Sequence, residues 1–224
     1  MKVILFDIDG TLIRSGGAGK WAIESALQHL FGLSVIQDGV SYAGRTDPGI
    51  THDLLVLHGI EPCEQHYQSV QDAYLERLPE SLKRIPGHVL PGVRELVAAL
   101  QSRHDCAIGL LTGNSQRGAA CKLGHFDLWH PFPFGGFGDK HFERHGVARE
   151  AFDAAELHLA ASVDPQDVWV IGDTPLDVTA ARSIGAQVLA VATGWCSVAE
   201  LEAVQPDWIL SDLTDTEQLM SRWF

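Results

Sequence analysis

Five short apolar runs alternate along this chain with segments of helical spacing. The first, residues 3–6, ends at Asp7, and continuous runs of this kind are typical of strands buried on both faces of a parallel sheet. The other predicted strands are 107–111, 168–171, 188–192 and 208–210. Helical spacing is clearest at Ile23, Ala26, Leu27, Leu30 and Phe31. This alternation predicts an α/β fold built on a parallel sheet.

The stretch from 21 to 82 departs from this alternation. It contains no strong strand pattern and is typical of several amphipathic helices. Breaks between these helices are predicted at Gly39, Gly44, Pro48 and 59–62. Two Pro-Gly pairs, at 86–87 and 91–92, mark the end of the stretch. We therefore predict a core of residues 1–15 and 86–224, interrupted by a small helical insert, residues 16–85.

Polar side chains directly follow three of the predicted strands, at Asp7, Thr112 and Asp173. In open parallel sheets, ligands bind beyond the carboxyl ends of the strands. We therefore expect the three clusters to line one cleft, with the helical insert over it.

Composition narrows the class of partner. The 16 Lys and Arg are scattered against 29 Asp and Glu, giving a formal net charge of −13, which disfavours nucleic acid. No run approaches the roughly 20 apolar residues of a membrane span, so no membrane partner is expected. The first apolar run is too short for a signal peptide, and the four cysteines form no C-x-x-C pair. These features predict a cytoplasmic protein with reduced thiols.

Residues 7–12, Asp-Ile-Asp-Gly-Thr-Leu, carry the first candidate chemistry. A turn after Asp7 lets this carboxylate and that of Asp9 approach one centre, and Gly10 lets an anion approach the backbone closely. One carboxylate can then attack phosphorus while the other protonates the leaving group. Alone, D-x-D-G also fits an ordinary surface turn.

With the strand before it, the segment resembles the first motif of the haloacid dehalogenase superfamily, D-x-D-G-T-[LV]. The resemblance implies a Rossmann-like parallel-sheet core with a small α-helical cap inserted after the motif. It implies that Asp7 is the nucleophile and a Mg²⁺ ligand. It also implies that Asp9 is the general acid and base, with its main-chain carbonyl as a further Mg²⁺ ligand.

The second cluster is Thr112-Gly113-Asn114. A hydroxyl and free N–H groups at a turn suit a phosphate oxygen, although a plain helix N-cap explains them as well. The cluster resembles the second motif of the superfamily, a Ser or Thr after a hydrophobic strand. This implies phosphate binding by Thr112, with Gly113 and Asn114 in the same turn.

A cation is needed to offset the charge of a phosphoryl-transfer transition state. Lys122 and Lys140 are the two candidates. Lys122 stands in a Lys-Leu pair between Thr-Gly-Asn and the Gly-Gly-Phe-Gly segment at 135–138. This order resembles superfamily members that carry the catalytic lysine in the Lys-Leu pair. Lys122 is therefore preferred, with Lys140 as the alternative.

The segment 172–177, from Gly172-Asp173 to Asp177, resembles the fourth motif, G-D-x-x-x-D. Carboxylates at a strand end and a helix start are hard oxygen ligands that suit Mg²⁺. The resemblance implies that Asp173 is a direct Mg²⁺ ligand. It implies that Asp177 holds a metal-bound water or orients Lys122. A simple N-cap role is the alternative for Asp177.

The insert holds two basic residues of interest. Arg45 lies between predicted helices, where it could bind a substrate carboxylate or form a surface pair with Asp47. Lys20 lies closer to the first motif, as a substrate contact or an ordinary surface residue.

The resemblance implies a Mg²⁺-dependent phosphatase, similar to phosphoglycolate phosphatases. Its oligomeric state is left open between a monomer and a homodimer. The enzyme would hydrolyse a small phosphorylated metabolite through an aspartyl-phosphate intermediate. A phosphomutase similar to β-phosphoglucomutase is the alternative, because it uses the same aspartates. A non-catalytic phosphate-binding regulatory module is disfavoured by the presence of Asp7, Asp9, Lys122 and Asp173 together.

Overall fold

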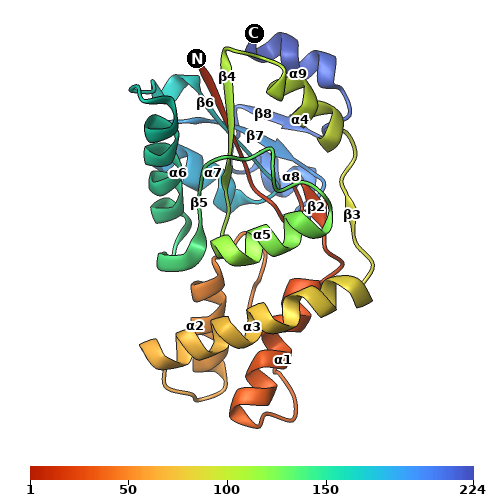
Figure 1. Ribbon diagram of the computed structural model, residues 1–224, viewed down its shortest axis with the longest axis vertical. Coiled ribbons are helices and arrows are strands. Elements are labelled where there is room, and N and C mark those ends of the chain that lie inside the picture. Colours follow the sequence, from red (N-terminus) through yellow and green to blue (C-terminus); the bar gives the residue numbers. More distant parts are fainter.

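A computed structural model describes residues 1–224 and is built around one six-stranded sheet. Every neighbouring pair of strands in this sheet is parallel, in the order β5-β4-β1-β6-β7-β8. The strands are β1 (Lys2–Phe6), β4 (Cys106–Leu111), β5 (Gly135–Gly136), β6 (Val168–Gly172), β7 (Gln187–Val191) and β8 (Trp208–Leu210). The predicted α/β fold with a Rossmann-like parallel sheet is confirmed (Figure 1).

Strand β1 lies inside the sheet, paired with β4 on one side and β6 on the other. Its side chains alternate between the two faces: Ile4 and Phe6 belong to one apolar cluster, and Val3 and Leu5 to another. All four are fully buried. Helices cover both faces of the sheet, which explains why this strand is an unbroken apolar run.

Five longer helices cover the sheet. Helices α4 (Val93–Gln101), α5 (Gln116–His125) and α9 (Thr216–Trp223) pack into the cluster that contains Ile4 and Phe6. Helices α6 (Arg144–Leu159) and α7 (Pro175–Ser183) pack into the opposite cluster. The remaining helical turns of the core are η1 (Gly138–Lys140), η2 (Pro165–Asp167) and α8 (Val198–Glu202).

The start of α7 shows how local sequence sets a boundary. Helix α7 begins at Pro175. Thr174 and Asp177 form a reciprocal capping box, and proline suits the first helical turn because it lacks an N–H group. Asp177 is therefore buried in the first turn of α7 and directed towards the end of β6.

The insert is helical, as the sequence predicts, and is called the cap (residues 16–85). It consists of α1 (Ala18–Phe31), α2 (Asp47–Leu57) and α3 (Glu64–Arg84), which share an apolar cluster of their own. The predicted break at Pro48 is wrong, because Pro48 occupies the first turn of α2 behind the N-cap Thr46. No helix in the chain is long and apolar enough to cross a membrane.

A two-stranded antiparallel ribbon joins the two connections between cap and core. Strand β2 (Ile13–Arg14) pairs with β3 (His88–Val89), so the chain leaves and re-enters the core at one place. The domain division predicted at residues 15 and 86 remains a prediction, and this ribbon lies beside both boundaries.

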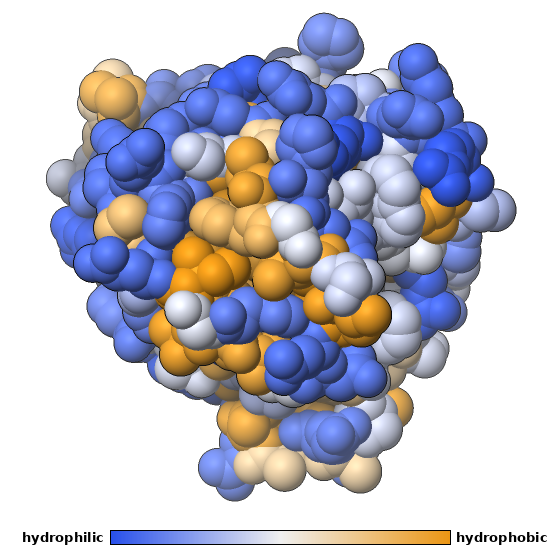
Figure 2. Space-filling model, turned by 90° about the horizontal axis from the view of Figure 1, so that it is seen from below, coloured by the Kyte–Doolittle hydropathy of each residue, from blue (hydrophilic) through white to orange (hydrophobic).

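Seen from the cap end, the surface is mainly hydrophilic, with a group of apolar side chains near the centre of the view (Figure 2).

Candidate active site

A cavity of about 580 Å³ lies between the strand ends and the cap. Asp7 follows β1, Asp173 follows β6, and Gly113 and Asn114 follow β4; all four line this cavity. The cap contributes lining residues from all three of its helices, among them Lys20, Asp47 and Tyr74. The expectation that the strand-end clusters meet under the insert is confirmed, at the edge where parallel sheets bind ligands.

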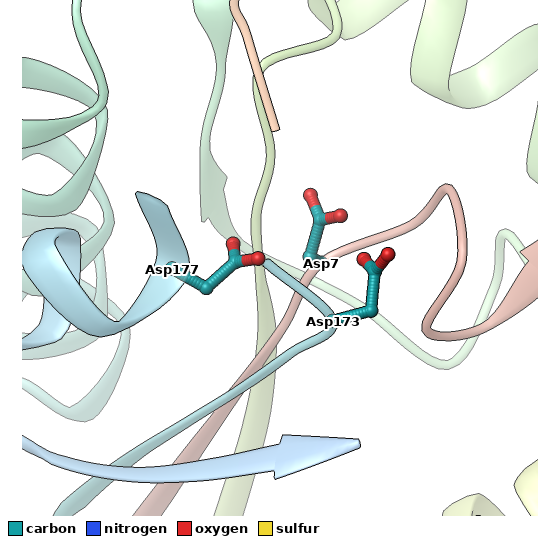
Figure 3. A group of neighbouring side chains, drawn as sticks. All are labelled: Asp7, Asp173 and Asp177. Carbon is teal, nitrogen blue, oxygen red and sulfur yellow. The ribbon is translucent and has the colours of Figure 1, made fainter. Parts of the chain in front are cut away.

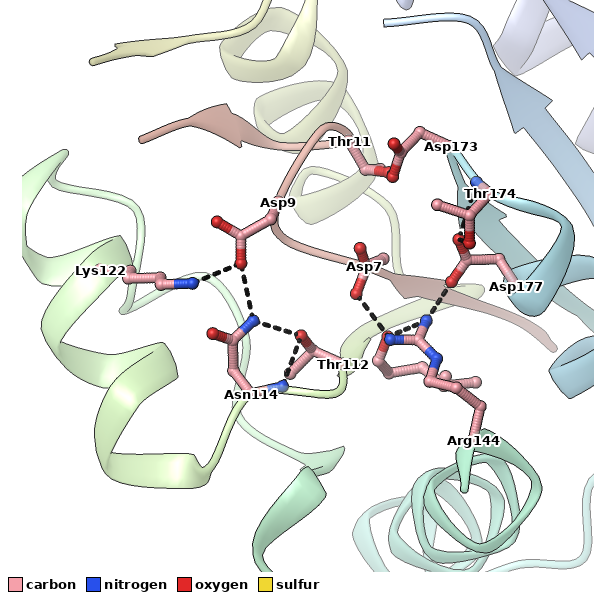
Figure 4. Close-up of polar contacts among 11 residues, drawn as sticks. Asp7, Asp9, Thr11, Thr112, Asn114, Lys122, Arg144, Asp173, Thr174 and Asp177 are labelled. Atoms are coloured by element: carbon pink, nitrogen blue, oxygen red, sulfur yellow. Dashed lines mark hydrogen bonds and ion pairs between the residues drawn. The ribbon is translucent and has the colours of Figure 1, made fainter. Parts of the chain in front are cut away.

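Asp7 is buried and paired with Arg144, which is also buried. Nη1 of Arg144 donates to Oδ1 of Asp7 at 3.1 Å, and Nη2 donates to Oδ1 of Asp177 (Figure 4). Burial raises the pKa of Asp7 to about 6, although the positive charge of Arg144 opposes this rise. Near neutral pH, Asp7 is therefore mainly an ionised carboxylate.

Asp9 lies across the turn from Asp7 and has its own cation. Lys122 Nζ donates to Oδ2 of Asp9 at 2.5 Å, and Nδ2 of Asn114 donates to the same oxygen at 2.9 Å. Burial alone would raise the pKa of Asp9, but Lys122 and these hydrogen bonds outweigh burial and lower it. The two carboxylates are thus held apart, each with a separate cation (Figure 4).

Gly10 makes the turn between these carboxylates possible. Its φ of 90° lies in the left-handed region, and a Cβ at this position would collide with the carboxylate of Asp173. The Gly in D-x-D-G therefore lets the first turn and the end of β6 approach each other.

The phosphate-binding residues predicted after β4 occupy two layers. Gly113 and Asn114 line the cavity, whereas Thr112 is fully buried behind them. Oγ1 of Thr112 accepts hydrogen bonds from Nδ2 of Asn114 at 2.9 Å and from its backbone N–H at 3.3 Å. In this arrangement Thr112 positions Asn114, which in turn reaches Asp9.

Three buried carboxylates form a cluster that suits a metal ion. Oxygens of Asp7, Asp173 and Asp177 lie within 4.8 Å of one another (Figure 3). Oδ2 of Asp173 is buried without any hydrogen-bond partner, which is costly for a carboxylate oxygen unless a cation meets it. Burial and the nearby carboxylates raise the pKa of Asp173 to about 8. An all-oxygen donor set of this kind fits a hard divalent cation.

Asp177 has partners that limit its role. Oδ2 accepts from the backbone N–H of Thr174 at 3.0 Å and from its hydroxyl at 2.7 Å, and Oδ1 contacts Arg144. The expectation that Asp177 orients Lys122 is wrong, because Lys122 lies beside Asp9 and Asp177 orients Arg144 instead. The alternative that Asp177 is the N-cap of the helix is also wrong, because Thr174 is the N-cap and Asp177 is the third residue of the first turn.

The cap loop before α2 contacts the core through Asp47. Its Oδ2 accepts a hydrogen bond from the backbone N–H of Ser115 at 2.8 Å. Arg45 lines the cavity but donates to Asp53 at 2.8 Å, so the suggested surface pair between Arg45 and Asp47 is wrong. Asp47 is directed towards the core and Arg45 back along α2.

Sequence reasoning missed Arg144. It is the first residue of α6. A basic residue after the Gly-Gly-Phe-Gly segment was its one available signal. Lys140, considered as an alternative cation, is exposed and does not line the cavity.

The geometry agrees with what the comparisons find. The sequence matches the haloacid dehalogenase-like hydrolase family over residues 1–185. A phosphoglycolate phosphatase of Synechococcus elongatus is 30% identical over 224 residues, covering 99% of this chain and 98% of its own length. Another, from Nitrosococcus oceani, is 25% identical over 99% of this chain and 97% of its own length.

Solved structures show the same fold. CbbY from Rhodobacter sphaeroides in complex with phosphate superposes with a TM-score of 0.78 at 18% identity, over 96% of both chains. A predicted phosphoglycolate phosphatase from Haemophilus somnus gives a TM-score of 0.75 at 22% identity, over 98% of both chains. The family match spans most of the chain and includes the strand ends that carry Asp7, Asn114 and Asp173. The chain belongs to the haloacid dehalogenase-like hydrolases.

Proposed function

We propose that this hydrolase is a Mg²⁺-dependent phosphatase that cleaves a small phosphate monoester through an aspartyl-phosphate on Asp7. One observation carries the proposal: Asp7 and Asp9 leave the same turn into one cavity, each held by a different buried cation. Two carboxylates in different electrostatic settings suit two roles, nucleophile and proton donor.

Asp7 is the better nucleophile of the pair. Its contact with Arg144 holds the carboxylate at the carboxyl end of β1. Its pKa of about 6 leaves it ionised at neutral pH. Attack on phosphorus transfers the phosphoryl group to Asp7 and releases an alkoxide. Arg144 also stays within reach of the negative charge that gathers on the phosphoryl oxygens.

Asp9 is suited to move a proton once substrate is bound. Lys122 and Asn114 hold Asp9 as a carboxylate in the free protein. A substrate phosphate competes for Lys122 because it carries more negative charge than one carboxylate. Loss of that partner raises the pKa of Asp9, so Asp9 can protonate the leaving oxygen and later accept a proton from the attacking water.

The carboxylates of Asp7 and Asp173, with the backbone carbonyl of Asp9, are the proposed Mg²⁺ ligands. The unpartnered Oδ2 of Asp173 supports this assignment. Bound Mg²⁺ would neutralise charge on the phosphate and on the clustered carboxylates. Asp177 would hold Arg144 and the backbone of Thr174 in place beside these ligands.

The proposed substrate class is that of the phosphoglycolate phosphatases, small phosphorylated metabolites. The phosphoglycolate phosphatase from Synechococcus elongatus supports this choice because it aligns over nearly the whole of both chains. The cavity also supports it, since the cap covers the strand ends and leaves about 580 Å³ for a ligand.

The test is phosphate release from an aryl phosphate with Mg²⁺, for the wild type and for Asp7→Asn. We expect turnover that needs Mg²⁺, is lost in Asp7→Asn and persists in Asp72→Asn, an exposed cap control. Rapid acid quench should show the wild type, but not Asp7→Asn, heavier by one phosphoryl group. Absence of turnover on a broad panel of monoesters would contradict the proposal, and turnover that needs a bisphosphate primer would indicate a phosphomutase.

A further inference from the structure

The first turn of α1 passes beside the proposed catalytic pair. Gly19 packs so closely on Lys122 that a Cβ at Gly19 would lie 3.2 Å from Lys122 Nζ. Lys122 in turn bonds to Asp9. Lys20 is the next residue after Gly19, so its Cα lies about 3.8 Å from that of Gly19.

This turn carries hydrogen-bond donors with no protein acceptor. Gly17, the residue before α1, has a φ of 93° and provides no side-chain cap. The backbone N–H groups of Ala18 and Trp21 are bonded, whereas those of Gly19 and Lys20 are not. The first turn contains no acidic residue, so the positive end of the helix dipole is not compensated. Gly17, Gly19 and Lys20 all line the cavity.

Tyr74 provides an independent observation at the same place. It comes from α3, is only 4% exposed and lines the same cavity. A Cβ at Gly19 would lie 3.9 Å from its hydroxyl, which forms no hydrogen bond within the protein and is open to the cavity rather than enclosed. A hydroxyl that faces a cavity and has no protein partner can donate a hydrogen bond to a bound ligand. The Tyr74 hydroxyl is therefore a free donor on the cavity wall, beside Gly19 in the first turn of α1.

Lys20 is the cap cation with donors to spare. Its nearest carboxylate is Glu24, at 3.7 Å and without a hydrogen bond, and its ammonium lies 5.1 Å from the ring centroid of Tyr42. Arg45, by contrast, already donates to Asp53 at 2.8 Å. Of these two cations on the cavity wall, Lys20 is the one able to meet an incoming anion.

We propose that Lys20, the N–H groups of Gly19 and Lys20, and the Tyr74 hydroxyl form a second anion-binding subsite. The substrate is then a small phosphate monoester that carries a second anionic group, a carboxylate or another phosphate. The inference rests on the proposed phosphatase function and deepens it by assigning what recognises the far end of the substrate. Both kinds of anionic group offer oxygens that accept from N–H and O–H donors.

The test compares kcat/KM within two matched pairs of esters. 2-Phosphoglycolate is compared with ethyl phosphate for the carboxylate, and glucose 1,6-bisphosphate with glucose 6-phosphate for the second phosphate. We expect the wild type to prefer the doubly anionic member of one pair by about 10- to 100-fold, and that pair identifies the anion. Lys20→Gln and Tyr74→Phe should each shrink this ratio about tenfold or less, chiefly through KM. Lys83→Gln, an exposed cap lysine outside the cavity, should keep the ratio.

Equal kcat/KM for both members of both pairs would overturn the subsite, as would a ratio unchanged in Lys20→Gln and Tyr74→Phe. If no ester is hydrolysed, the proposed function fails and the subsite is decided by calorimetry on Asp7→Asn. Tighter binding of 2-phosphoglycolate or glucose 1,6-bisphosphate than of its partner, lost when Lys20→Gln is added, supports the subsite. Equal binding within both pairs overturns it.

Discussion

Asp47 in the cap accepts a hydrogen bond from the backbone N–H of Ser115 in the core, at 2.8 Å. The backbone N–H of Asp47 also donates to the carbonyl of Gly113 at 2.8 Å. Ser115 is the N-cap of α5, the helix that carries Lys122. Burial raises the pKa of Asp47, and the nearby charge of Lys122 opposes this rise. The carboxylate of Asp47 therefore connects the cap to the helix that positions Lys122, the proposed catalytic lysine.

Asp47→Ala should reduce kcat/KM by about tenfold or more, because it removes a charged acceptor from a buried N–H group at the cap–core contact. Asp47→Asn keeps an oxygen acceptor and should retain more of the activity. Steady-state kinetics and limited proteolysis of the cap would measure the effect, with Glu80→Ala at an exposed cap residue as control. Wild-type kinetics in a folded Asp47→Ala protein would show that the contact has no part in activity.

Arg144→Ala should destabilise the protein by about 3–5 kcal/mol, since it leaves the buried Asp7 and Asp177 without their cation. Arg144→Lys should keep more stability yet lose activity, because one ammonium cannot reproduce the two-armed contact. Urea denaturation and kcat measure the two effects separately. Arg149→Ala, which breaks an exposed pair with Asp153 on the same helix, should change stability by only about 0–1 kcal/mol. Similar losses in Arg144→Ala and Arg149→Ala would contradict this account.

Mg²⁺ should stabilise the protein more as pH rises from about 6 to about 8. The pKa of Asp173 is raised from 3.8 to about 8, and that of Asp7 from 3.8 to about 6. A raised aspartate pKa favours folding below the unfolded value, and this contribution is lost as pH rises through the folded value. A cation that binds the ionised carboxylates replaces the lost stability.

Thermal unfolding with EDTA and with MgCl2 at several pH values would measure this change. Asp173→Asn removes one of the two carboxylates and should reduce the Mg²⁺-dependent shift in Tm. A Tm shift that is the same at every pH, or that survives unchanged in Asp173→Asn, would place the cation elsewhere.

Asp9→Asn should affect poor leaving groups more than good ones. If Asp9 protonates the leaving oxygen, an alkyl phosphate depends on it, whereas a nitrophenolate leaves with little help. We expect kcat to fall by about 10²- to 10⁴-fold for the alkyl ester and by less for the aryl ester, when measured in parallel. Equal losses on both esters would assign Asp9 to binding or to metal coordination rather than to proton transfer.

The sequence predicted the parts of the site that stand next to a strand. Asp7 and Asp173 were found because each follows a buried apolar run directly, and parallel topology brings such positions together. The order β5-β4-β1-β6-β7-β8 could not be derived in this way, because apolar periodicity does not specify which strands are neighbours.

Arg144 and Asp47 were missed for a different reason. Arg144 lies 137 residues from Asp7 and 33 from Asp177, so no local pattern links it to either partner. The partner of Asp47 is a backbone N–H group, which has no signature in the sequence. The prediction at Pro48 was wrong because the effect of proline depends on its position. Proline breaks a helix when it lies in the interior, but it is favoured in the first turn, where Pro48 lies.

The ribbon of β2 and β3 also bears on how such a protein can change. Arg14 pairs with His88 and Ile13 with Val89, so the points where the cap leaves and re-enters the core are direct neighbours. Inserted units are tolerated best where their two ends lie close together, because the host then needs little rearrangement to accept them. The cap is in this sense an exchangeable module: a different helical unit attached at Arg14 and His88 could alter substrate choice while Asp7, Asp9 and Asp173 keep their places on the sheet.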